Sequence, residues 1–483
     1  MTETFKNYVA GQWVESRSKK TFENRNPANT DELIGRFQAS EAADVHAACD
    51  AAERAFPQWS TLPAPKRGEV LYRAAELLEQ RLPKLAEEMT REEGKTLPEA
   101  KGEVKRAVSI FRYYAGEGAR MFNQQIPSER ENVMAYTLRK PLGVYGLVTP
   151  WNFPSAIPAW KLAPALVAGD TVVLKPASQA PLSAWRLVEA LHEAGAPAGV
   201  VNLVTGSGTA AGNALADHPA VRGISFTGSN AVGNKLYDKV SAKRLRIQLE
   251  MGGKNPTIVL KDADVDAAVE ILVNGAFFST GQKCTSCSRA IIEQPLYDKV
   301  MEKLVARTKK LRVGNGLESN VDVGPAVSRH QLETDLEYVD IAQKEGAELL
   351  CGGRRITGGL YDKGFFFEPT IFAGVKPEMR IAQEEVFGPV LAVLQAADFQ
   401  DAMRLANKAK FGLAASIVSK DLSRVHEFIN TIEAGLIVVN LPTAGVEYQL
   451  PFGGTKASSF GLREQGHTAL DFYTETRTVY LRY

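Results

Sequence analysis

Cys284 is the first candidate for chemistry in this chain, as a nucleophile. It lies in the segment STGQKCTSCS (residues 279–288), where Gly281 allows a tight backbone turn and small polar side chains surround the thiol. A cysteine acts as a nucleophile only where its surroundings leave it accessible and favour the thiolate. An isolated cysteine is more often a small buried apolar residue, so Cys284 alone leaves both interpretations open.

Glu250 and Asn152 are candidates for proton transfer and for stabilising negative charge. Glu250 ends an apolar run and precedes two glycines, a position that suits a general base and equally a solvent-exposed glutamate. Asn152 lies between Pro150 and Pro154, which fix the backbone around it. A rigidly held amide can donate to an oxyanion, although a turn asparagine has the same local sequence.

Two further patterns bear on whether the chain binds a cofactor or a metal. The segment FTGSNAVG (residues 226–233) places Gly228 and Gly233 between an expected strand and an expected helix, a turn suited to close approach of a cofactor. It departs from the GxGxxG fingerprint, so it is weak as a dinucleotide motif. The spacing of Cys284 and Cys287 resembles half of a zinc or redox site, but no second cysteine or histidine pair matches it. We therefore expect no metal.

The first third of the chain, which precedes these residues, is expected to be helical. Apolar residues recur at helical spacing from Gly68 to Met89, with Pro83 expected to kink or divide the helix. A second amphipathic stretch runs from about Glu103 to Phe122. These helices would form part of the frame that positions the candidate residues.

Beyond Pro141 short apolar runs alternate with helical segments. This alternation predicts right-handed βαβ units and a parallel sheet, with a ligand at the carboxyl ends of its strands. A second α/β region is expected from Asn255 to about Leu450, and the tail 474–483 resembles an exposed edge strand that favours oligomerisation. The expected strands of the two regions are 144–149, 171–174, 200–204, 223–227, 257–260, 290–293 and 436–440, and the expected helices are 183–194 and 208–216.

Composition limits the classes of protein to which the chain can belong. The chain has 483 residues, which is longer than a single hydrophobic core usually supports, so two or three domains are expected. A net charge of +1 gives no support to a nucleic-acid or membrane-surface role. Four cysteines make a poor disulfide framework, the N-terminus is polar, and no apolar stretch is long enough to span a membrane. A cytoplasmic enzyme in a reducing compartment is the expectation.

Taken together, the segments resemble the aldehyde dehydrogenase superfamily over essentially the whole chain. The 34-residue separation of Glu250 and Cys284 is also that of the family. The motifs that carry the resemblance are TPWNFP (149–154), WK (160–161), KPAS (175–178), FTGS (226–229), LEMGG (249–253), GQKC (281–284), EEVFGP (384–389) and PFGG (451–454). Within the superfamily, EMGGKNP (250–256), TGQKCTS (280–286) and AGVE (444–447) are most similar to the bacterial 2-oxoglutarate semialdehyde (2,5-dioxopentanoate) dehydrogenases.

The resemblance implies a role for each candidate. Cys284 would attack the aldehyde carbon, and the Asn152 amide and the Cys284 backbone N–H would stabilise the oxyanion. Loss of hydride to the nicotinamide would leave a thioester, which water activated by Glu250 would hydrolyse. Lys161 would lie near the cofactor ribose and assist proton transfer. Cys287 would be a neighbour of the pocket and not a second nucleophile.

The resemblance also implies an NAD(P) site. NAD-preferring relatives often have glutamate at the position of Ser178, where a carboxylate would repel a 2′-phosphate. Ser178 removes that repulsion and Lys175 offers a positive partner, so we expect NADP to be accepted and preferred over NAD. The expected cofactor-binding residues are Thr149, Pro150, Trp151, Lys175, Ser178, Thr227, Gly228, Ser229, Gly233, Gly252, Glu385 and Phe387.

Two kinds of aldehyde remain open as substrate. Semialdehyde enzymes often have an arginine six residues before the nucleophile, where this chain has Phe278. By analogy the residues Phe153, Trp160, Phe278 and Phe452 would form an aromatic wall, which favours apolar or aromatic aldehydes. Alternatively, Arg112 and Arg120 from the preceding helix would anchor the carboxylate of a semialdehyde.

The family's architecture sets the expected domains. Residues 1–118 and 142–253 would form a Rossmann-like cofactor domain, and residues 254–452 an α/β catalytic domain. Residues 119–141 and 453–483 would form an oligomerisation arm and C-terminal tail that join protomers into a homodimer or homotetramer.

Two rival functions remain on the same fold. A CoA-acylating dehydrogenase would release the thioester to CoA, whereas Glu250 favours water as the acceptor. A non-enzymatic protein would have no need of Cys284 and Glu250, and both are present.

Overall fold

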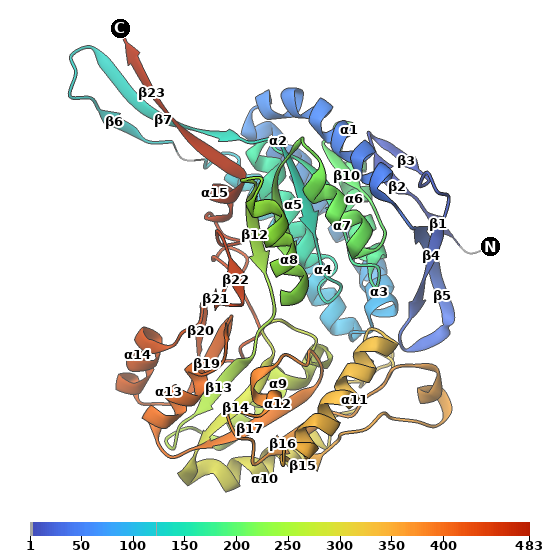
Figure 1. Cartoon of the computed structure of the whole chain (residues 1–483), viewed down its shortest axis with the longest axis vertical. Coiled ribbons are helices and arrows are strands. Elements are labelled where there is room, and N and C mark those ends of the chain that lie inside the picture. The colour runs from blue at the N-terminus through green and yellow to red at the C-terminus, as the bar shows by residue number, and fades with distance from the viewer. Residues whose placement is uncertain (1–2, 122) are drawn as a thin grey trace.

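Two large sheets form the two halves of the molecule (Figure 1). The structure is a computed structural model that describes residues 3–121 and 123–483. The first sheet has eight strands in the order β22-β12-β11-β8-β9-β10-β2-β3. Their bounds are β2 (Asn7–Val9), β3 (Gln12–Val14), β8 (Val144–Val148), β9 (Thr171–Lys175), β10 (Val201–Leu203), β11 (Val221–Thr227), β12 (Arg246–Glu250) and β22 (Ser459–Phe460).

The centre of the first sheet, from β12 to β10, is parallel, as the alternating sequence predicted. Its strands are apolar on both faces because helices cover both sides, and alternate residues point in opposite directions. Val144 and Val173 pack on one side with α1 (Ala42–Thr61), α7 (Gly208–Asp217) and α8 (Asn230–Ser241). Tyr145 and Val172 face the other core. That core also contains residues of α2 (Ala64–Gln80), α3 (Leu82–Glu93), α4 (Leu97–Glu117), α5 (Ala156–Ala168) and α6 (Pro181–Glu193).

The predicted helices are present, but their bounds differ from those read from the sequence. The helix expected from Gly68 to Met89 is divided into α2 and α3 at Arg81, with Pro83 in the first turn of α3, where proline is tolerated. Helix α4 begins six residues before the expected Glu103. Thr96 and Glu99 form a capping box at its start, which fixes this boundary.

The second sheet has seven strands in the order β15-β16-β17-β14-β13-β19-β20, all parallel except the edge strand β15. Their bounds are β13 (Asn255–Val259), β14 (Cys287–Glu293), β15 (Glu348–Cys351), β16 (Thr370–Ala373), β17 (Val390–Ala396), β19 (Ala414–Val418) and β20 (Leu436–Val439). Helices α9 (Val265–Phe277) and α10 (Tyr297–Thr308) supply the core on one side. Helices α11 (Arg329–Lys344), α12 (Arg380–Gln383), α13 (Phe399–Asn407) and α14 (Leu422–Thr431) supply the core on the other. The predicted α/β class is confirmed.

A three-stranded arm projects from the body beside the first sheet (Figure 1). It consists of β6 (Gln125–Pro127), β7 (Val133–Pro141) and β23 (Thr474–Arg482), all antiparallel, with β23 at one edge. The tail is therefore a strand, as its sequence predicted. The segment before it returns to the first half, where β22 pairs with β12 and α15 (Ala469–Tyr473) joins the core with α5.

The remaining elements are short. A small sheet contains β1 (Thr4–Phe5), β4 (Thr21–Asn26) and β5 (Asn29–Gln38), and β18 (Phe411–Gly412) pairs with β21 (Thr455–Lys456). Three 3₁₀ turns are η1 (Phe278–Gly281), η2 (Gln294–Leu296) and η3 (Gly359–Lys363). Within residues 3–121 and 123–483, no helix has the length and apolarity needed to cross a membrane.

Candidate active site

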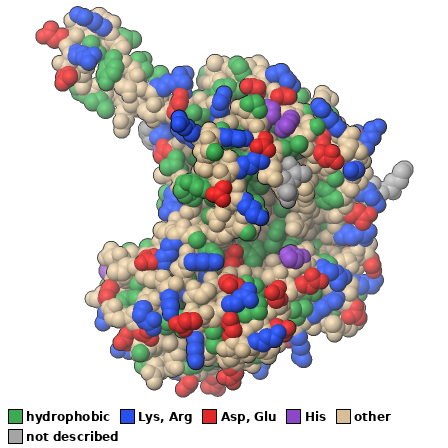
Figure 2. Space-filling view, in the orientation of Figure 1, with side chains coloured by type: hydrophobic (Ala, Val, Ile, Leu, Met, Phe, Trp, Pro, Cys, Tyr) green, Lys and Arg blue, Asp and Glu red, His purple; other side chains and the backbone are tan. Residues whose placement is uncertain are grey.

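The site lies where the chain passes from the first sheet to the second. Strand β12 ends at Glu250, and Cys284 lies in the loop between η1 and β14. A cavity of about 220 Å³ brings residues of both halves together, and Figure 2 shows the surface hollowed between the halves, with hydrophobic side chains inside. Its lining residues are Pro150, Trp151, Asn152, Ile157, Thr227, Gly228, Ser229, Met251, Gly252, Cys284, Gln331, Glu385 and Phe387.

The loop that carries Cys284 is held in a constrained conformation. Ser279 and Thr280 have positive φ angles of 54° and 55°, which non-glycine residues rarely adopt. Gly281 also has a positive φ, and a Cβ there would lie 2.2 Å from the carbonyl oxygen of Gly388. Asn255 Nδ2 then donates to the backbone oxygen of Cys284 at 2.8 Å. These constraints fix where the thiol faces the cavity.

The Cys284 thiol is half-buried, and its electrostatic surroundings favour the protonated form. Burial raises the pKa of the thiol to about 12, and the negative charges of Glu385 and Glu250 add to the rise. The thiolate is the nucleophilic form. Attack therefore requires a neighbouring base or a positive charge that enters with a ligand.

Asn152 lines the same cavity as Cys284 and is buried. Its Nδ2 donates to the backbone oxygen of Gln282 at 3.0 Å, and its own backbone oxygen accepts from Lys95 Nζ at 2.7 Å. Lys95 is buried as well and pairs with Glu103 at 2.6 Å. The side chain of Asn152 is thus held by the loop before Cys284 and its backbone by Lys95, so the amide has the fixed position that an oxyanion donor needs.

Glu250 lies at the carboxyl end of β12 and is buried, so it is not a solvent-exposed strand-end residue. Ser459 Oγ donates to its Oε2 at 2.5 Å. Burial and the nearby negative charge of Glu464 raise the pKa of Glu250 well above its usual range. A carboxyl group with a raised pKa suits proton transfer near neutral pH.

Glu464 is a residue that sequence reasoning missed. It is buried, forms an ion pair with Lys161, and accepts a hydrogen bond from Trp160 Nε1 at 2.8 Å. Lys161 also donates to Ser225 Oγ at 2.7 Å. No local motif surrounds Glu464, because its partners lie some 300 residues earlier in the chain.

Lys161 itself is fully enclosed on α5 and is absent from the lining of the cavity. Its positive charge lowers the pKa of Glu250 and so opposes the effect of Glu464. In this structure Lys161 acts on the Glu250 carboxylate through charge and does not line the cavity.

Glu385 approaches the backbone of the turn after β12 closely. A Cβ at Gly252 would lie 2.0 Å from Glu385 Oε2, so a larger residue there would have to displace the end of the Glu385 side chain. The backbone N–H of Gly253 donates to Glu385 Oε1 at 2.8 Å, while burial raises the pKa of Glu385 to about 7. Phe387 adopts a positive φ of 64°, and its ring meets that of Trp151 edge-on at 5.3 Å.

Several groups of the cavity fit a dinucleotide. Thr227 lines the cavity and Thr149 precedes the lining residue Pro150; their hydroxyls are buried and have no hydrogen-bond partner among the described residues, so a bound ligand can supply one. Thr227, Gly228 and Ser229 precede α8, whose N-terminus attracts phosphate. Gly233 in the first turn of α8 packs closely against Met251, because a Cβ there would lie 2.6 Å from the Met251 sulfur.

Lys175 is the last residue of β9 and Ser178 lies three residues beyond it, and neither lines the cavity. Lys175 is buried, which lowers the pKa of its ammonium group to about 8, and its Nζ donates to the backbone oxygen of Pro176 at 2.8 Å. Ser178 Oγ donates to the backbone oxygen of Gly206 at 2.9 Å. Both are therefore held in place by the backbone of the first half.

Of the four predicted aromatic residues, two are buried and two are half-buried. Trp160 and Phe452 are buried and their ring centroids lie 5.5 Å apart. Phe153 and Phe278 are half-buried, and Lys95 Nζ lies 4.3 Å from the centroid of the Phe153 ring.

The two predicted arginine anchors are engaged elsewhere. Arg112 pairs with Glu79, and both side chains are about half-exposed. Arg120 pairs with Glu117 at 2.7 Å. Neither arginine lines the cavity that contains Cys284.

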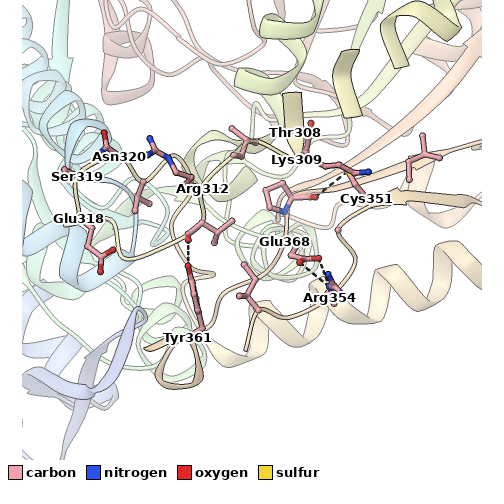
Figure 3. A pocket seen from close by; sticks show the side chains of 17 residues that line it. Thr308, Lys309, Arg312, Glu318, Ser319, Asn320, Cys351, Arg354, Tyr361 and Glu368 are labelled. Atoms are coloured by element: carbon pink, nitrogen blue, oxygen red, sulfur yellow. Dashed lines mark hydrogen bonds and ion pairs between the residues drawn. The ribbon is translucent and has the colours of Figure 1, made fainter. Parts of the chain in front are cut away.

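Cys287 is buried, and burial raises the pKa of its thiol to about 11. A separate cavity of about 840 Å³ is not lined by Cys284. Figure 3 shows it bordered by Arg354 and Glu368, which pair with each other, and by Tyr361 and Cys351. Burial raises the pKa of Cys351, so this cavity offers no activated nucleophile.

Known proteins match the chain over its length. Residues 13–479 match the aldehyde dehydrogenase family. An alpha-ketoglutaric semialdehyde dehydrogenase of Bacillus subtilis is 47% identical over 99% of this chain and 98% of its own. A 2,5-dioxopentanoate dehydrogenase of Saccharolobus solfataricus is 44% identical over 98% of each chain.

Solved structures agree with the sequence relatives. An NAD-dependent aldehyde dehydrogenase from Sinorhizobium meliloti superposes with a TM-score of 0.97 at 36% identity, covering 100% of this chain and 95% of its own. A betaine aldehyde dehydrogenase from Staphylococcus aureus in complex with NAD⁺ gives a TM-score of 0.96 at 34% identity, covering 99% and 94%. Like these proteins, the chain belongs to the aldehyde dehydrogenase family, whose members oxidise aldehydes through a cysteine with NAD(P).

Proposed function

We propose that this enzyme oxidises 2-oxoglutarate semialdehyde to 2-oxoglutarate. The observation that carries the proposal is the full-length similarity, at 44% and 47% identity, to two enzymes named for this substrate. The segments around Glu250 and Cys284 share the same resemblance.

The residues of the site divide the reaction between them. Cys284 Sγ attacks the aldehyde carbon and forms a hemithioacetal, while Asn152 Nδ2 and the Cys284 N–H donate to its oxyanion. Bound NAD(P) supplies the acceptor for the hydride that leaves this carbon. Glu250 then takes a proton from water, which attacks the resulting thioester, and the carbon–sulfur bond breaks to release the carboxylate and the thiol.

Other residues are proposed to hold the cofactor. Glu385 lies where a ribose hydroxyl can donate to it, and Phe387 beside Trp151 would position the nicotinamide ring. We further propose that NADP is preferred, because Ser178 brings no negative charge and Lys175 lies three residues before it. The pyrophosphate would bind at Thr227, Gly228 and Ser229.

A second candidate substrate class has its own support. Trp160 and Phe452 form an aromatic pair, Phe153 and Phe278 are half-buried, and none of the four carries a charge that would bind a carboxylate. This composition favours benzaldehyde or a medium-chain aldehyde.

A substrate panel separates the two classes. Initial rates of NAD(P)H formation are measured with 2-oxoglutarate semialdehyde, succinic semialdehyde, benzaldehyde and hexanal, each with NAD and with NADP. A kcat/KM at least tenfold higher for the semialdehydes supports the proposal. A preference for benzaldehyde or hexanal contradicts it. A strict requirement for CoA would instead point to an acylating enzyme.

The arrangement of elements supports a proposal about assembly. We propose that residues 1–118 and 142–253 form the cofactor domain, with β22 and α15 added from the tail, and that residues 254–452 form the catalytic domain. The arm carries exposed apolar side chains: Ile126 on β6 and Tyr480 on β23 are 55% and 64% exposed, and Tyr483, which follows β23, is 79% exposed. Such a surface suits a second copy of the chain and a homodimer or homotetramer.

The cytoplasm is the proposed location. All four cysteines, Cys49, Cys284, Cys287 and Cys351, are free thiols, which suits a reducing compartment.

A further inference from the structure

One face of helix α4 contacts, one after another, three segments that surround Cys284. Glu99 in its first turn accepts from the backbone N–H of Ser279 at 2.7 Å, next to Phe278. Glu103, one turn later, accepts from the N–H groups of Ser155 and Ala156 at 2.8 Å and 3.1 Å. These contacts fix the helix against the loop before Cys284 and against the turn that carries Asn152.

The same face continues toward the loop before Phe452. Tyr113 packs edge-on against Tyr448, with ring centroids 5.7 Å apart. Arg106 lies between Glu103 and Tyr113 on this face, because residues three, four and seven apart share one side of a helix. Among its charged neighbours are Glu447 and Glu103.

Arg106 has unused hydrogen-bonding capacity. Its Nε and Nη2 are buried and have no acceptor within residues 3–121 and 123–483 as the structure describes them. Burial lowers the pKa of its guanidinium, and the charges of Glu447 and Glu103 oppose that effect. A buried guanidinium without an acceptor is costly, and such groups are rare unless a ligand or water completes them.

The nearby carboxylates already have other partners. Glu103 Oε1 accepts from Ser155 and Ala156, and its Oε2 accepts from Lys95. Glu447 is exposed and accepts from Gln449 Nε2. The free Nε and Nη2 of Arg106 therefore form a fork suited to an incoming carboxylate.

We propose that Arg106 binds the carboxylate of the aldehyde substrate, at the end of the molecule remote from Cys284. This inference rests on the proposed function and names the residue that recognises the charged end of a semialdehyde. It replaces Arg112 and Arg120 in that role, since both are paired with glutamates. It also explains how a semialdehyde enzyme can have Phe278 where related enzymes often have arginine, because the positive charge that binds the carboxylate comes from α4.

The test compares a charged and a neutral aldehyde of the same length. In Arg106→Met, kcat/KM for 2-oxoglutarate semialdehyde falls about 100-fold, mainly through KM, because a charge-assisted bidentate contact is lost. For pentanal it changes less than threefold. Arg106→Lys recovers part of the loss. The matched control is Lys105→Met, which removes an exposed cation from the neighbouring position and leaves both substrates unaffected.

Equal losses for both aldehydes in Arg106→Met would overturn the inference and indicate a structural role. An unchanged preference in Arg106→Met, or a loss of preference in Arg112→Met, would also overturn it.

Glutarate separates failure of the inference from failure of the proposed function. It carries the carboxylate without the aldehyde, so it should inhibit pentanal oxidation by the wild-type enzyme and inhibit Arg106→Met at least tenfold more weakly. Equal inhibition of both proteins would overturn the Arg106 assignment. If the wild-type enzyme prefers neutral aldehydes while glutarate inhibition still depends on Arg106, the proposed substrate is wrong and the carboxylate site stands.

Discussion

At the scale of single residues, the protonation of Cys284 limits reactivity most directly. Its pKa is raised to about 12 by burial and by the charges of Glu385 and Glu250. Because the pKa is raised, the thiol is the main form throughout the neutral range and the thiolate appears only as pH rises. The free enzyme should thus hold its nucleophile in an unreactive state.

The pH dependence of alkylation checks this expectation. Inactivation of the cofactor-free enzyme by iodoacetamide should accelerate about tenfold per pH unit between pH 7 and pH 9, without a plateau. Peptide mass spectrometry shows whether Cys284 is the modified residue, with Cys284→Ser as the control. A plateau below pH 9 would mean that the thiol is already activated in the free enzyme.

The proposed preference for NADP is expected to depend on one residue. Ser178→Glu should lower the ratio of kcat/KM for NADP to that for NAD by about tenfold or more, because a carboxylate would repel the 2′-phosphate. Ser178→Gln has a similar size and no charge, so it separates repulsion from crowding. Steady-state kinetics with both cofactors give the ratios. An unchanged ratio in Ser178→Glu would refute the proposed role of Ser178.

Local sequence could predict residues that lie inside recognisable motifs and could not predict their remote partners. Cys284 and Asn152 were predicted from the chain alone, and they line one cavity. Glu464 and Arg106 were not, because their importance depends on contacts with residues far along the chain. Burial without a partner, which distinguishes Arg106 from Arg112, can only be seen in three dimensions.

At the scale of elements, the turn that follows β12 determines how closely a ligand reaches the backbone. A Cβ at Gly252 would lie 2.0 Å from Glu385 Oε2. Gly252→Ala should therefore displace Glu385, and we expect KM for NADP to rise about tenfold or more. Gly102→Ala is the control, since Gly102 lies exposed in α4 with nothing within 4 Å of its added Cβ. It should leave kinetics unchanged and stabilise the helix by about 0.5–1 kcal/mol.

Cofactor titration and thermal unfolding of the two glycine variants provide the measurements. An unchanged KM in Gly252→Ala would show that Glu385 does not need its present position.

Element type was more predictable than element boundaries. Alternation of apolar runs and helical segments gave the parallel strands of the first sheet, since strands covered on both faces are continuously apolar. The start of α4 was missed by six residues, although Thr96 and Glu99 supply a capping box there. The left-handed backbone of Ser279 and Thr280 had no basis in local propensity, because tertiary contacts hold it.

At the scale of the whole molecule, the arm is the proposed basis of assembly. Deleting residues 474–483 removes β23, which pairs with β7 from Val133 to Pro141, and leaves β7 paired only with the short strand β6 within the described chain. We expect a smaller assembly by light scattering coupled to size exclusion, and a melting temperature lower by several degrees. Tyr480→Ser with Leu481→Ser keeps the strand and removes apolar surface, so it should weaken assembly alone. An unchanged molar mass for the deletion would exclude the arm as the interface.

Long-range pairing across the chain was beyond sequence reasoning. The edge-strand character of 474–483 was visible in its residues, but its partner β7 lies more than 300 positions earlier. The return of β22 to the first sheet carried no local pattern, since it has only two residues.

This return of the tail has a consequence for biosynthesis. Ser459 donates to Glu250, and Glu464 pairs with Lys161, so the surroundings of the proposed catalytic base come from residues more than 200 positions later in the chain. While the ribosome has not yet released residues 459–464, the emerging polypeptide lacks these partners and leaves two ionisable groups uncompensated. The nascent enzyme should therefore remain inactive, with the edge at β12 unpaired, until these residues have emerged, which makes this edge a natural point for chaperones to bind.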